Sequence, residues 1–256
     1  MGTLEGKRAL VLGVANERSI AWGIARALAD EGARVGLTYV GDSLERRVRP
    51  LAEKIGADVL GNCDVTDDAQ IEATAGRVES QWGQLDILVH AIAFAQREDL
   101  TGRFVDTGRE GFRLALDVSA YSLVALTRAF LPMLSPSQGS ILTLSFAGSE
   151  RVFPNYNVMG VAKAALESAV RYLAADIGPE GVRINAISAG PIKTLSAAGI
   201  RNFRDMLNVA GQRAPMRRNV DTDDIGKLAA SLSGPAGRGI TGQVIHADSG
   251  LSILGV

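Results

Sequence analysis

The sequence predicts an α/β protein built on a doubly wound parallel sheet of about seven strands, in a single domain of residues 1–256. Short apolar runs alternate with longer amphipathic stretches along almost the whole chain, which is the element order of such a sheet. The short runs are nearly continuous in hydrophobic residues, as expected for strands covered on both faces. No internal repeat, low-complexity tract or linker interrupts this pattern, and one core can accommodate a chain of this length.

The expected elements follow in order along the chain. Seven apolar runs are the predicted strands: Arg8–Val14, Arg34–Tyr39, Asp58–Asn62, Leu85–Ala91, Ser140–Ser145, Arg183–Ala189 and Gln243–Ala247. Six amphipathic stretches between them are the predicted helices: Ser19–Glu31, Leu44–Ile55, Asp68–Trp82, Glu110–Leu134, Asn157–Ile177 and Asp223–Leu232. Glycines that follow several helices are expected to end them: Gly32, Gly56, Gly83 and Gly178.

An additional helical segment at about residues 194–212 separates the last two predicted strands. Within Leu195–Gly211, the apolar residues Ile200, Phe203, Met206 and Leu207 fall on one helical face. The segment follows the carboxyl end of the sixth strand, where doubly wound folds bind ligands. It is either a substrate-binding helix or an ordinary surface helix packed on the core, and periodicity leaves both interpretations open.

Composition and charge narrow the classes of function. Lys and Arg total 27 against 28 Asp and Glu, a formal net charge of -1, which argues against nucleic-acid partners and anionic membranes. The amino terminus resembles no signal peptide, and no uninterrupted apolar stretch approaches the ~20 residues needed to span a bilayer. We therefore expect a cytoplasmic protein. Cys63 is the single cysteine and His90 and His246 are the only histidines, so no metal site is expected and the chemistry depends on Tyr, Lys, Ser, Asp or an organic cofactor.

The first strand and helix carry a candidate dinucleotide site. Gly13 permits a sharp turn after the strand, and Ser19 is positioned to cap the helix whose N–H groups attract a phosphate. At the end of the second strand no acidic residue is available for the ribose, while Arg46 and Arg47 lie on the next helix, either as partners of a 2′-phosphate or as a solvated face. The sequence favours NADH and leaves NADPH possible.

Two further strand ends fit a nucleotide. Asp64 and Val65 follow the third strand, where Asp64 either meets the adenine edge or caps the following helix. After the fourth strand, the run from His90 to Ala93 has small residues where a flat ring would pass. His90 is expected to be a packed or hydrogen-bonded histidine rather than a catalytic one.

Tyr156 and Lys163 form the most specific pair in the chain. They are separated by seven residues, two turns of a helix, so we expect both side chains along one stripe. A tyrosine hydroxyl can donate a hydrogen bond to a carbonyl oxygen, and an ammonium can stabilise negative charge and bind ribose hydroxyls.

At these residues the chain resembles the short-chain dehydrogenase/reductase superfamily, and within it the NADH-using bacterial enoyl-acyl-carrier-protein reductases. The segments that carry the resemblance are GVANERSIAWGIA, HAIAFA, PNYNVMGVAKAALE and VRINAISAGPIKTLSAAGI. The resemblance covers essentially the whole chain and implies a Rossmann-type fold. It also implies reduction of a trans-2-enoyl thioester in type II fatty acid biosynthesis, a homotetramer, and an acyl carrier protein as the partner that bears the substrate.

The resemblance implies a role for individual residues. Tyr156 would hydrogen-bond the thioester carbonyl and stabilise an enolate, and Lys163 would hold the nicotinamide ribose. The other cofactor-binding residues would be Gly13, Ser19, Ile20, Asp64, Val65, Ile92, Ile192 and Thr194. The acyl pocket would be lined by Ala95, Met159, Ala197, Ile200, Phe203 and Met206.

Phe146 and Met159 separate this hypothesis from its alternatives. Relatives that reduce ketones have a Ser and a Tyr at these two positions, and neither Phe146 nor Met159 can protonate an alkoxide. Many enoyl reductases carry a second tyrosine where Phe146 stands, and we expect its loss to reduce activity or shift substrate range without abolishing turnover. A carbonyl-reducing dehydrogenase and a non-catalytic dinucleotide sensor on the same fold remain the alternatives.

A local basic cluster surrounds the additional helical segment. Its members are Arg201, Arg204, Arg213, Arg217 and Arg218. In a chain without net positive charge, such a cluster either docks an acidic acyl carrier protein or is a solvated helix face.

Overall fold

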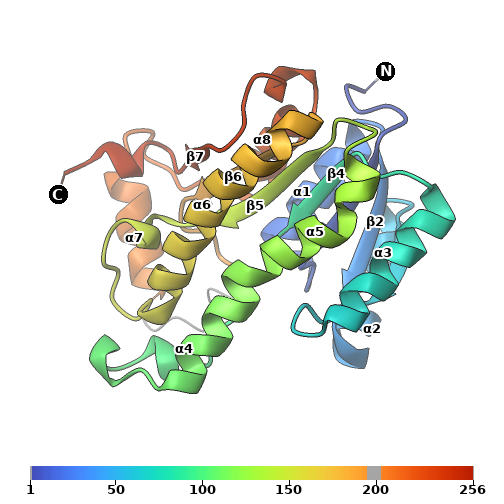
Figure 1. The fold of residues 1–256 in the computed structure, drawn as a ribbon. Helices are drawn as coiled ribbons and strands as arrows, with labels where there is room; N and C mark the ends of the chain where they lie inside the picture. The colour runs from blue at the N-terminus through green and yellow to red at the C-terminus, as the bar shows by residue number, and fades with distance from the viewer. Residues whose placement is uncertain (1, 195–202, 256) are drawn as a thin grey trace.

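All seven predicted strands are present in a single parallel sheet. In the computed structural model, which describes residues 2–194 and 203–255, the strand order is β3-β2-β1-β4-β5-β6-β7 (Figure 1). The strands are β1 Arg8–Leu12, β2 Arg34–Tyr39, β3 Asp58–Asn62, β4 Ile87–His90, β5 Ser140–Ser145, β6 Arg183–Ala189 and β7 Val244–Ala247. The order reverses between β1 and β4, the point at which open α/β sheets bind ligands beyond their carboxyl ends.

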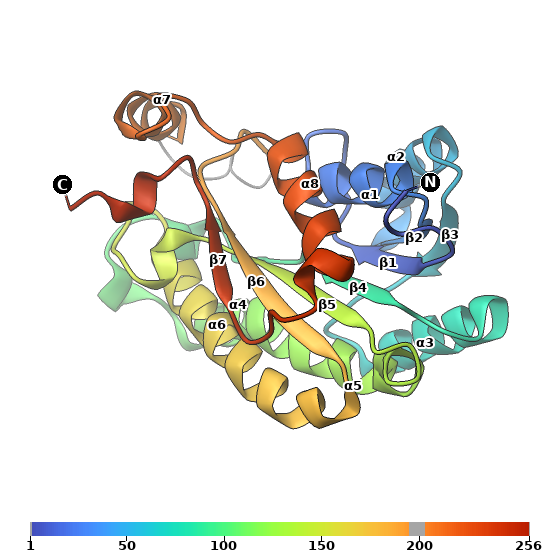
Figure 2. The same cartoon turned by 90° about the horizontal axis from the view of Figure 1, so that it is seen from above.

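Helices cover both faces of the sheet. They are α1 Ile20–Asp30, α2 Gly41–Lys54, α3 Asp68–Trp82, α4 Arg109–Leu116, α5 Ser122–Leu134, α6 Val158–Ile177, α7 Phe203–Arg213 and α8 Thr222–Ser233. Side chains from α1, α2 and α8 form one core with the sheet, and side chains from α3, α5 and α6 form the other. The view from above shows these two layers on opposite sides of the strands (Figure 2). The predicted doubly wound α/β fold is confirmed.

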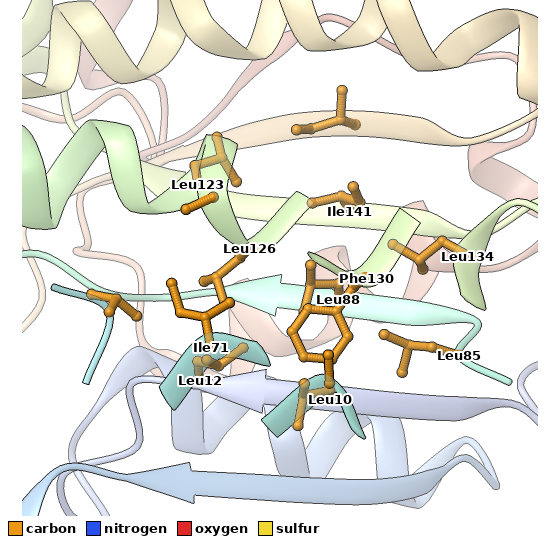
Figure 3. Close-up of a cluster of buried hydrophobic side chains, with 14 of the residues drawn as sticks. Leu10, Leu12, Ile71, Leu85, Leu88, Leu123, Leu126, Phe130, Leu134 and Ile141 are labelled. Atoms are coloured by element: carbon orange, nitrogen blue, oxygen red, sulfur yellow. The ribbon is translucent and has the colours of Figure 1, made fainter. Parts of the chain in front are cut away.

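The second of these cores is built from long aliphatic side chains around Phe130. Leu10, Leu88 and Ile141 project from the sheet, and Phe130 projects onto them from α5 (Figure 3). All four are fully buried, and burial of each such side chain contributes about 1.5–3 kcal/mol. This packing fixes α5 and the neighbouring α6 against the strands whose ends carry the candidate site.

The predicted helix Glu110–Leu134 is interrupted. A π-helical turn at Asp117–Tyr121 separates α4 from α5, and the hydroxyl of Ser122 donates to the Val118 carbonyl at 2.7 Å, beside the widened turn. Such turns are frequent at functional sites. As one run, Arg109–Leu134 has the length and composition of a membrane span, but 56% of its most apolar window is buried inside the protein. This is the property of a core helix.

The glycine stops are confirmed at three of the four predicted positions. Gly32, Gly56 and Gly83 have φ values of 90°, 62° and 71°, which favour glycine over other residues. Gly178 instead has φ of -57° and continues into a short 3-10 turn. The left-handed residue that ends this turn is Gly181, with φ of 82°.

Candidate active site

The ends of β1 and β4 approach each other closely at Gly13. Leu12 pairs with His90 in the sheet register, and Gly13 follows with φ of 101°. A Cβ at this position would lie 2.0 Å from the Ala91 carbonyl oxygen. Glycine is therefore required both by the backbone conformation and by the contact between the strand ends.

Ser19 is the residue at the start of α1, but its side chain makes no cap bond. The hydroxyl donates instead to the Asn16 carbonyl at 2.6 Å, so the predicted side-chain cap is wrong. Helix α1 begins shortly after the end of β1, next to the sheet switch point, and a helix N-terminus at this place suits an anion such as a pyrophosphate.

At the end of β3, Asp64 does not cap α3. The cap is Asp67, whose carboxylate accepts from the Ala69 N–H at 3.0 Å. Asp64 accepts from the backbone and side chain of Thr66 in a local turn, so the cap interpretation of Asp64 is wrong. Val65 is buried in the core.

Tyr156 precedes α6 and does not lie on it. The helix begins at Val158, and Asn157 between them has φ of 37° and ψ of -115°. Asn155 also has a positive φ of 61°. Asparagine tolerates this region better than most residues, so the two asparagines allow the chain to turn on both sides of Tyr156. The predicted placement of Tyr156 and Lys163 two turns apart on one helix is therefore wrong in its geometry.

The ring of Tyr156 rests on the turn that follows β5. It contacts Phe146 edge-on with ring centroids 5.0 Å apart, and Phe146 in turn contacts Phe153 at 4.8 Å. A Cβ on Gly148 would lie 2.5 Å from Cδ1 of Tyr156. Burial, and secondarily the charge of Glu167, raises the pKa of the Tyr156 hydroxyl, so the phenol remains a neutral donor near neutral pH.

Lys163 is buried, with 6% of its surface exposed. Its ammonium donates to the Leu144 carbonyl at the end of β5, at 2.7 Å. Burial lowers the pKa of Lys163 to about 8, while the charge of Glu167 acts in the opposite direction. The side chain is therefore mostly charged at neutral pH, and its ammonium contacts the carboxyl end of β5.

His90 is a fully buried, hydrogen-bonded histidine, as predicted. The Ser122 hydroxyl donates its hydrogen to the Val118 carbonyl, so its oxygen accepts from Nε2 of His90 at 2.8 Å. Because Nε2 carries the proton of the neutral ring, Nδ1 accepts from the Thr143 hydroxyl, also at 2.8 Å. Burial, and secondarily the charge of Lys163, lowers the pKa of His90 to about 3. The imidazole is neutral.

The residues predicted to line the acyl pocket are only partly described. Met159 is buried and Ala95 and Met206 are half-buried. Ala197 and Ile200 lie outside the described residues, as does the side chain of Phe203. On the cofactor side, Ile20, Ile92, Ile192 and Thr194 are half-buried after the ends of β1, β4 and β6.

Sequence reasoning missed Ser119, which is fully buried in the π-helical turn. Its hydroxyl accepts from the Phe94 N–H at 3.0 Å and lies 3.8 Å from the Met159 sulfur. It thereby connects the loop after β4 to α6. A buried serine inside an apolar helix gives no distinct signal in the sequence.

Comparison with known proteins agrees with this arrangement. The family model described as Enoyl-(Acyl carrier protein) reductase matches residues 13–252. The chain belongs to this family. It is 51% identical over 255 residues to enoyl-[acyl-carrier-protein] reductase [NADH] 1 of Rhizobium meliloti, covering 100% of this chain and 93% of that relative. The expected membership of the short-chain dehydrogenase/reductase superfamily is confirmed.

Two solved structures show the same fold. The enoyl-[acyl-carrier-protein] reductase (NADH) of Aquifex aeolicus superposes with a TM-score of 0.97 at 50% identity, covering 100% of both chains. The reductase of Anaplasma phagocytophilum in complex with NAD has a TM-score of 0.94 at 42% identity, covering 100% of this chain and 95% of that one.

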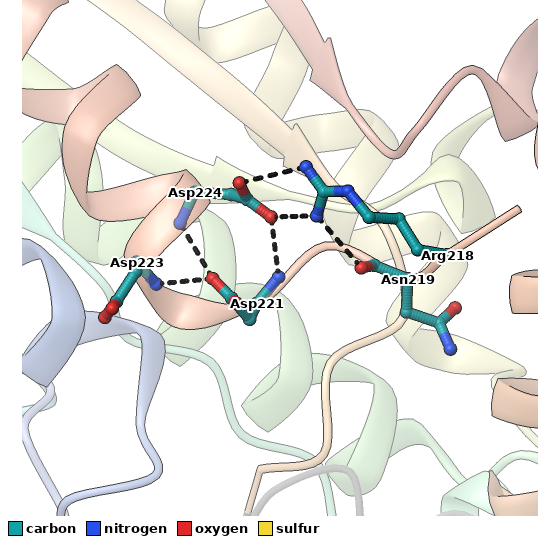
Figure 4. Close-up of polar contacts among 5 residues, drawn as sticks. All are labelled: Arg218, Asn219, Asp221, Asp223 and Asp224. Atoms are coloured by element: carbon teal, nitrogen blue, oxygen red, sulfur yellow. Dashed lines mark hydrogen bonds and ion pairs between the residues drawn. The ribbon is translucent and has the colours of Figure 1, made fainter. Parts of the chain in front are cut away.

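One arginine of the predicted basic cluster is engaged in an ion pair within the protein. Arg218 pairs with Asp224, whose carboxylate also accepts from the Asp221 N–H in the capping box of α8 (Figure 4). Arg218 is therefore engaged in fixing the start of α8. Arg204 and Arg213 are exposed on α7, and Arg201 lies outside the described residues.

Proposed function

We propose that Tyr156 and Lys163 are the catalytic pair of this NADH-dependent enoyl-acyl-carrier-protein reductase. The single observation that carries the proposal is the placement of these two groups: the Tyr156 ring rests on the turn after β5, and the buried Lys163 ammonium donates to the end of the same strand. Ketone-reducing relatives would need hydrogen-bond donors at positions 146 and 159. Phe146 and Met159 are both apolar here. The site is therefore suited to a carbonyl whose neighbouring double bond is reduced, rather than to a ketone.

NADH, when bound, supplies the hydride that adds to the β-carbon of a trans-2-enoyl thioester. The Tyr156 hydroxyl donates a hydrogen bond to the thioester carbonyl oxygen and stabilises the enolate charge that develops there. Its raised pKa supports this role, because the group stays protonated. Lys163 adds a positive charge beneath the site and binds the ribose hydroxyls of the cofactor. A proton is then added at the α-carbon to complete the reduction.

The residues around the sheet switch point fit a dinucleotide. The start of α1, where Ser19 provides no side-chain cap, suits the pyrophosphate, and Gly13 allows the sharp turn that leads to it. Ile20 would contact the same region, Asp64 and Val65 the adenine, and Ile92 the adjoining ribose. Ile192 and Thr194 would meet the nicotinamide carboxamide and the phosphates.

The substrate side is proposed to combine α6 with the segment at about residues 194–212. Ala95, Met159, Ala197, Ile200, Phe203 and Met206 would line the acyl pocket. The half-buried Met206 on α7 supports this assignment because an apolar side chain is available on that helix. Replacing Met206 by Lys should weaken the binding of long-chain enoyl substrates more than that of a four-carbon substrate. Steady-state KM values for the two substrates would measure this difference.

An acyl carrier protein would deliver the enoyl substrate in the cytoplasm. The enzyme would be a homotetramer, without nucleic-acid or membrane partners. Exposed Arg204 and Arg213 support docking of an acidic carrier protein. Arg201→Glu combined with Arg204→Glu should raise KM for the carrier-bound substrate and weaken its salt dependence, whereas Arg171→Glu on α6 should not. Analytical ultracentrifugation tests the tetramer, and cell fractionation tests the location.

The central experiment follows NADH oxidation with a short trans-2-enoyl thioester and with a 3-oxoacyl thioester. Consumption with the enoyl substrate alone is expected. Tyr156→Phe should lower kcat by about 100-fold, the scale of one lost oxyanion donor. Tyr172→Phe, at an exposed position of α6, is the matched control and should retain wild-type turnover. Undiminished turnover of Tyr156→Phe would refute the assignment.

A further inference from the structure

Glu167 is a buried acid that the proposed chemistry does not use. It lies on α6 with 6% of its surface exposed, and acidic residues are seldom buried to this extent without partners. Its Oε1 atom accepts hydrogen bonds from the hydroxyls of Ser145 and Ser149, the second at 2.7 Å. The burial of a charged side chain at this place requires an explanation beyond packing.

Glu167 follows Lys163 by one helical turn, so the two side chains occupy neighbouring positions on the same face of α6. Lys163 donates to the carbonyl of Leu144, and Glu167 accepts from the side chain of the next residue, Ser145. The two ionisable residues therefore hold two consecutive residues at the carboxyl end of β5. The helix and the strand are fixed to each other where the candidate site begins.

The two serines also bracket the turn beneath Tyr156. Ser145 ends β5, and Ser149 ends the short 3-10 helix η4, Ala147–Ser149. Between them lies Gly148, which directly contacts the Tyr156 ring. The carboxylate of Glu167 thus holds both ends of the segment on which that ring rests.

The charge of Glu167 acts on both proposed catalytic groups. It raises the pKa of Lys163 against the effect of burial, and it also raises the pKa of Tyr156. On β4, the buried His90 is a further titratable group near Lys163, and the charge of Lys163 contributes to lowering the pKa of His90. The proposed reaction needs Lys163 as a charged ammonium and Tyr156 as a neutral phenol.

We propose that Glu167 is a positioning residue, whose carboxylate anchors the turn that supports Tyr156 and places a negative charge one helical turn from the Lys163 ammonium. This inference rests on the proposed roles of those two residues. Glu167 touches neither the substrate nor the cofactor in this scheme and acts through its neighbours.

The test is the pH dependence of kcat/KM for enoyl thioester reduction by the full chain saturated with NADH. Glu167→Gln keeps an oxygen that can accept from both serines but removes the charge. The basic limb of the profile should move to lower pH by about one unit, the scale of one nearby opposite charge. Asp176→Asn removes a charge from an exposed position on the same helix, about 20 Å along the helix from Lys163, and should leave the limb in place. Coincident profiles for Glu167→Gln and wild type would overturn the inference.

Ser149→Ala is the second variant and keeps the charge. Loss of one anchor of the turn should lower kcat by about tenfold, since small displacements of a catalytic group are costly, with the KM for NADH unchanged. An unchanged kcat would contradict the anchoring role. Full activity of Tyr156→Phe in the same assay would instead refute the proposed function, so the two failures are distinguishable.

Discussion

Acid should destabilise this protein through His90. The imidazole is buried with both nitrogens hydrogen-bonded in a neutral ring, and its pKa is lowered from 6.5 to about 3. The unfolded chain binds a proton on His90 below pH 6.5, and the folded protein does not until about pH 3. Stability contributed by the neutral ring is therefore fully present above pH 6.5 and is lost as the pH falls toward 3.

The size of the effect follows from the two pKa values. Each unit of difference corresponds to about 1.36 kcal/mol, so at pH 4 the free energy of unfolding should have lost about 3 kcal/mol through His90 alone. The full difference, reached near pH 3, is about 5 kcal/mol. Domains of this kind are stable by only about 5–15 kcal/mol, so a change of this size is a large fraction of the free energy of unfolding.

The measurement is urea denaturation at fixed protein concentration between pH 7 and pH 4. His90→Gln cannot ionise, so its loss of stability over that range should be smaller than wild type by about 3 kcal/mol, whatever its stability at pH 7. His246→Gln replaces the other histidine, which is surface-accessible, and should not reproduce the change in pH dependence seen for His90→Gln. Parallel curves for wild type and His90→Gln would refute the reasoning.

Three substitutions test the local geometry. Gly148→Ala places a methyl group 2.5 Å from the Tyr156 ring and should lower kcat by about tenfold or more, whereas Gly76→Ala in α3, with open space around it, should keep kcat and add about 0.5–1 kcal/mol to the free energy of unfolding. Gly13→Ala, where φ is 101°, should raise the KM for NADH and lower the melting temperature, and an unchanged KM would count against the site. Asp221→Ala removes the capping box of α8 and should cost about 1 kcal/mol in urea denaturation, with kcat unaltered.

The sheet could be predicted because each strand is recognisable from its own residues. Parallel strands covered on both faces leave continuous apolar runs, and all seven of these runs became strands with ends shifted by at most a few residues. The candidate site could be placed for a related reason, since the residues that follow parallel strands meet at one edge. Gly13, Asp64 and Ile92 all belong to that class.

The position of Tyr156 could not be predicted in the same way. Hydrophobic periodicity reports which face of a helix is buried but contains no information about a single residue with positive φ. Asn157 turns the chain at φ of 37° before α6 begins, and the ring orientation then depends on Gly148, which is contributed by a turn after a different strand. The interruption of the long helix at Asp117–Tyr121 was not predictable either, and within it Ser119 contacts Phe94, a residue distant in the sequence.

The burial of Glu167 could have been predicted from the hydrophobic pattern of its helix. Leu166, Val170 and Ala174 recur at helical spacing and are buried, and Glu167 falls within the same stripe. A charge inside an apolar stripe contradicts the local rule that acids face water, and such contradictions concentrate where function requires them. The two serine partners, one at the end of β5 and one in η4, were not predictable, because they lie 22 and 18 residues away in the sequence and approach Glu167 only in the folded protein.

The buried ionisable groups of β4 and α6 are best understood as one set. A neutral His90 ends β4, and a charged Lys163 and the acceptor Glu167 lie one turn apart on α6. Each is held by donors or acceptors from β5 or α5, namely Thr143, Leu144, Ser145 and Ser122. Since β5 contributes to all three, a change that shifts its carboxyl end disturbs the charge on the lysine and the support of Tyr156 together. The proposed catalytic geometry and the electrostatics around Lys163 therefore depend on the same strand.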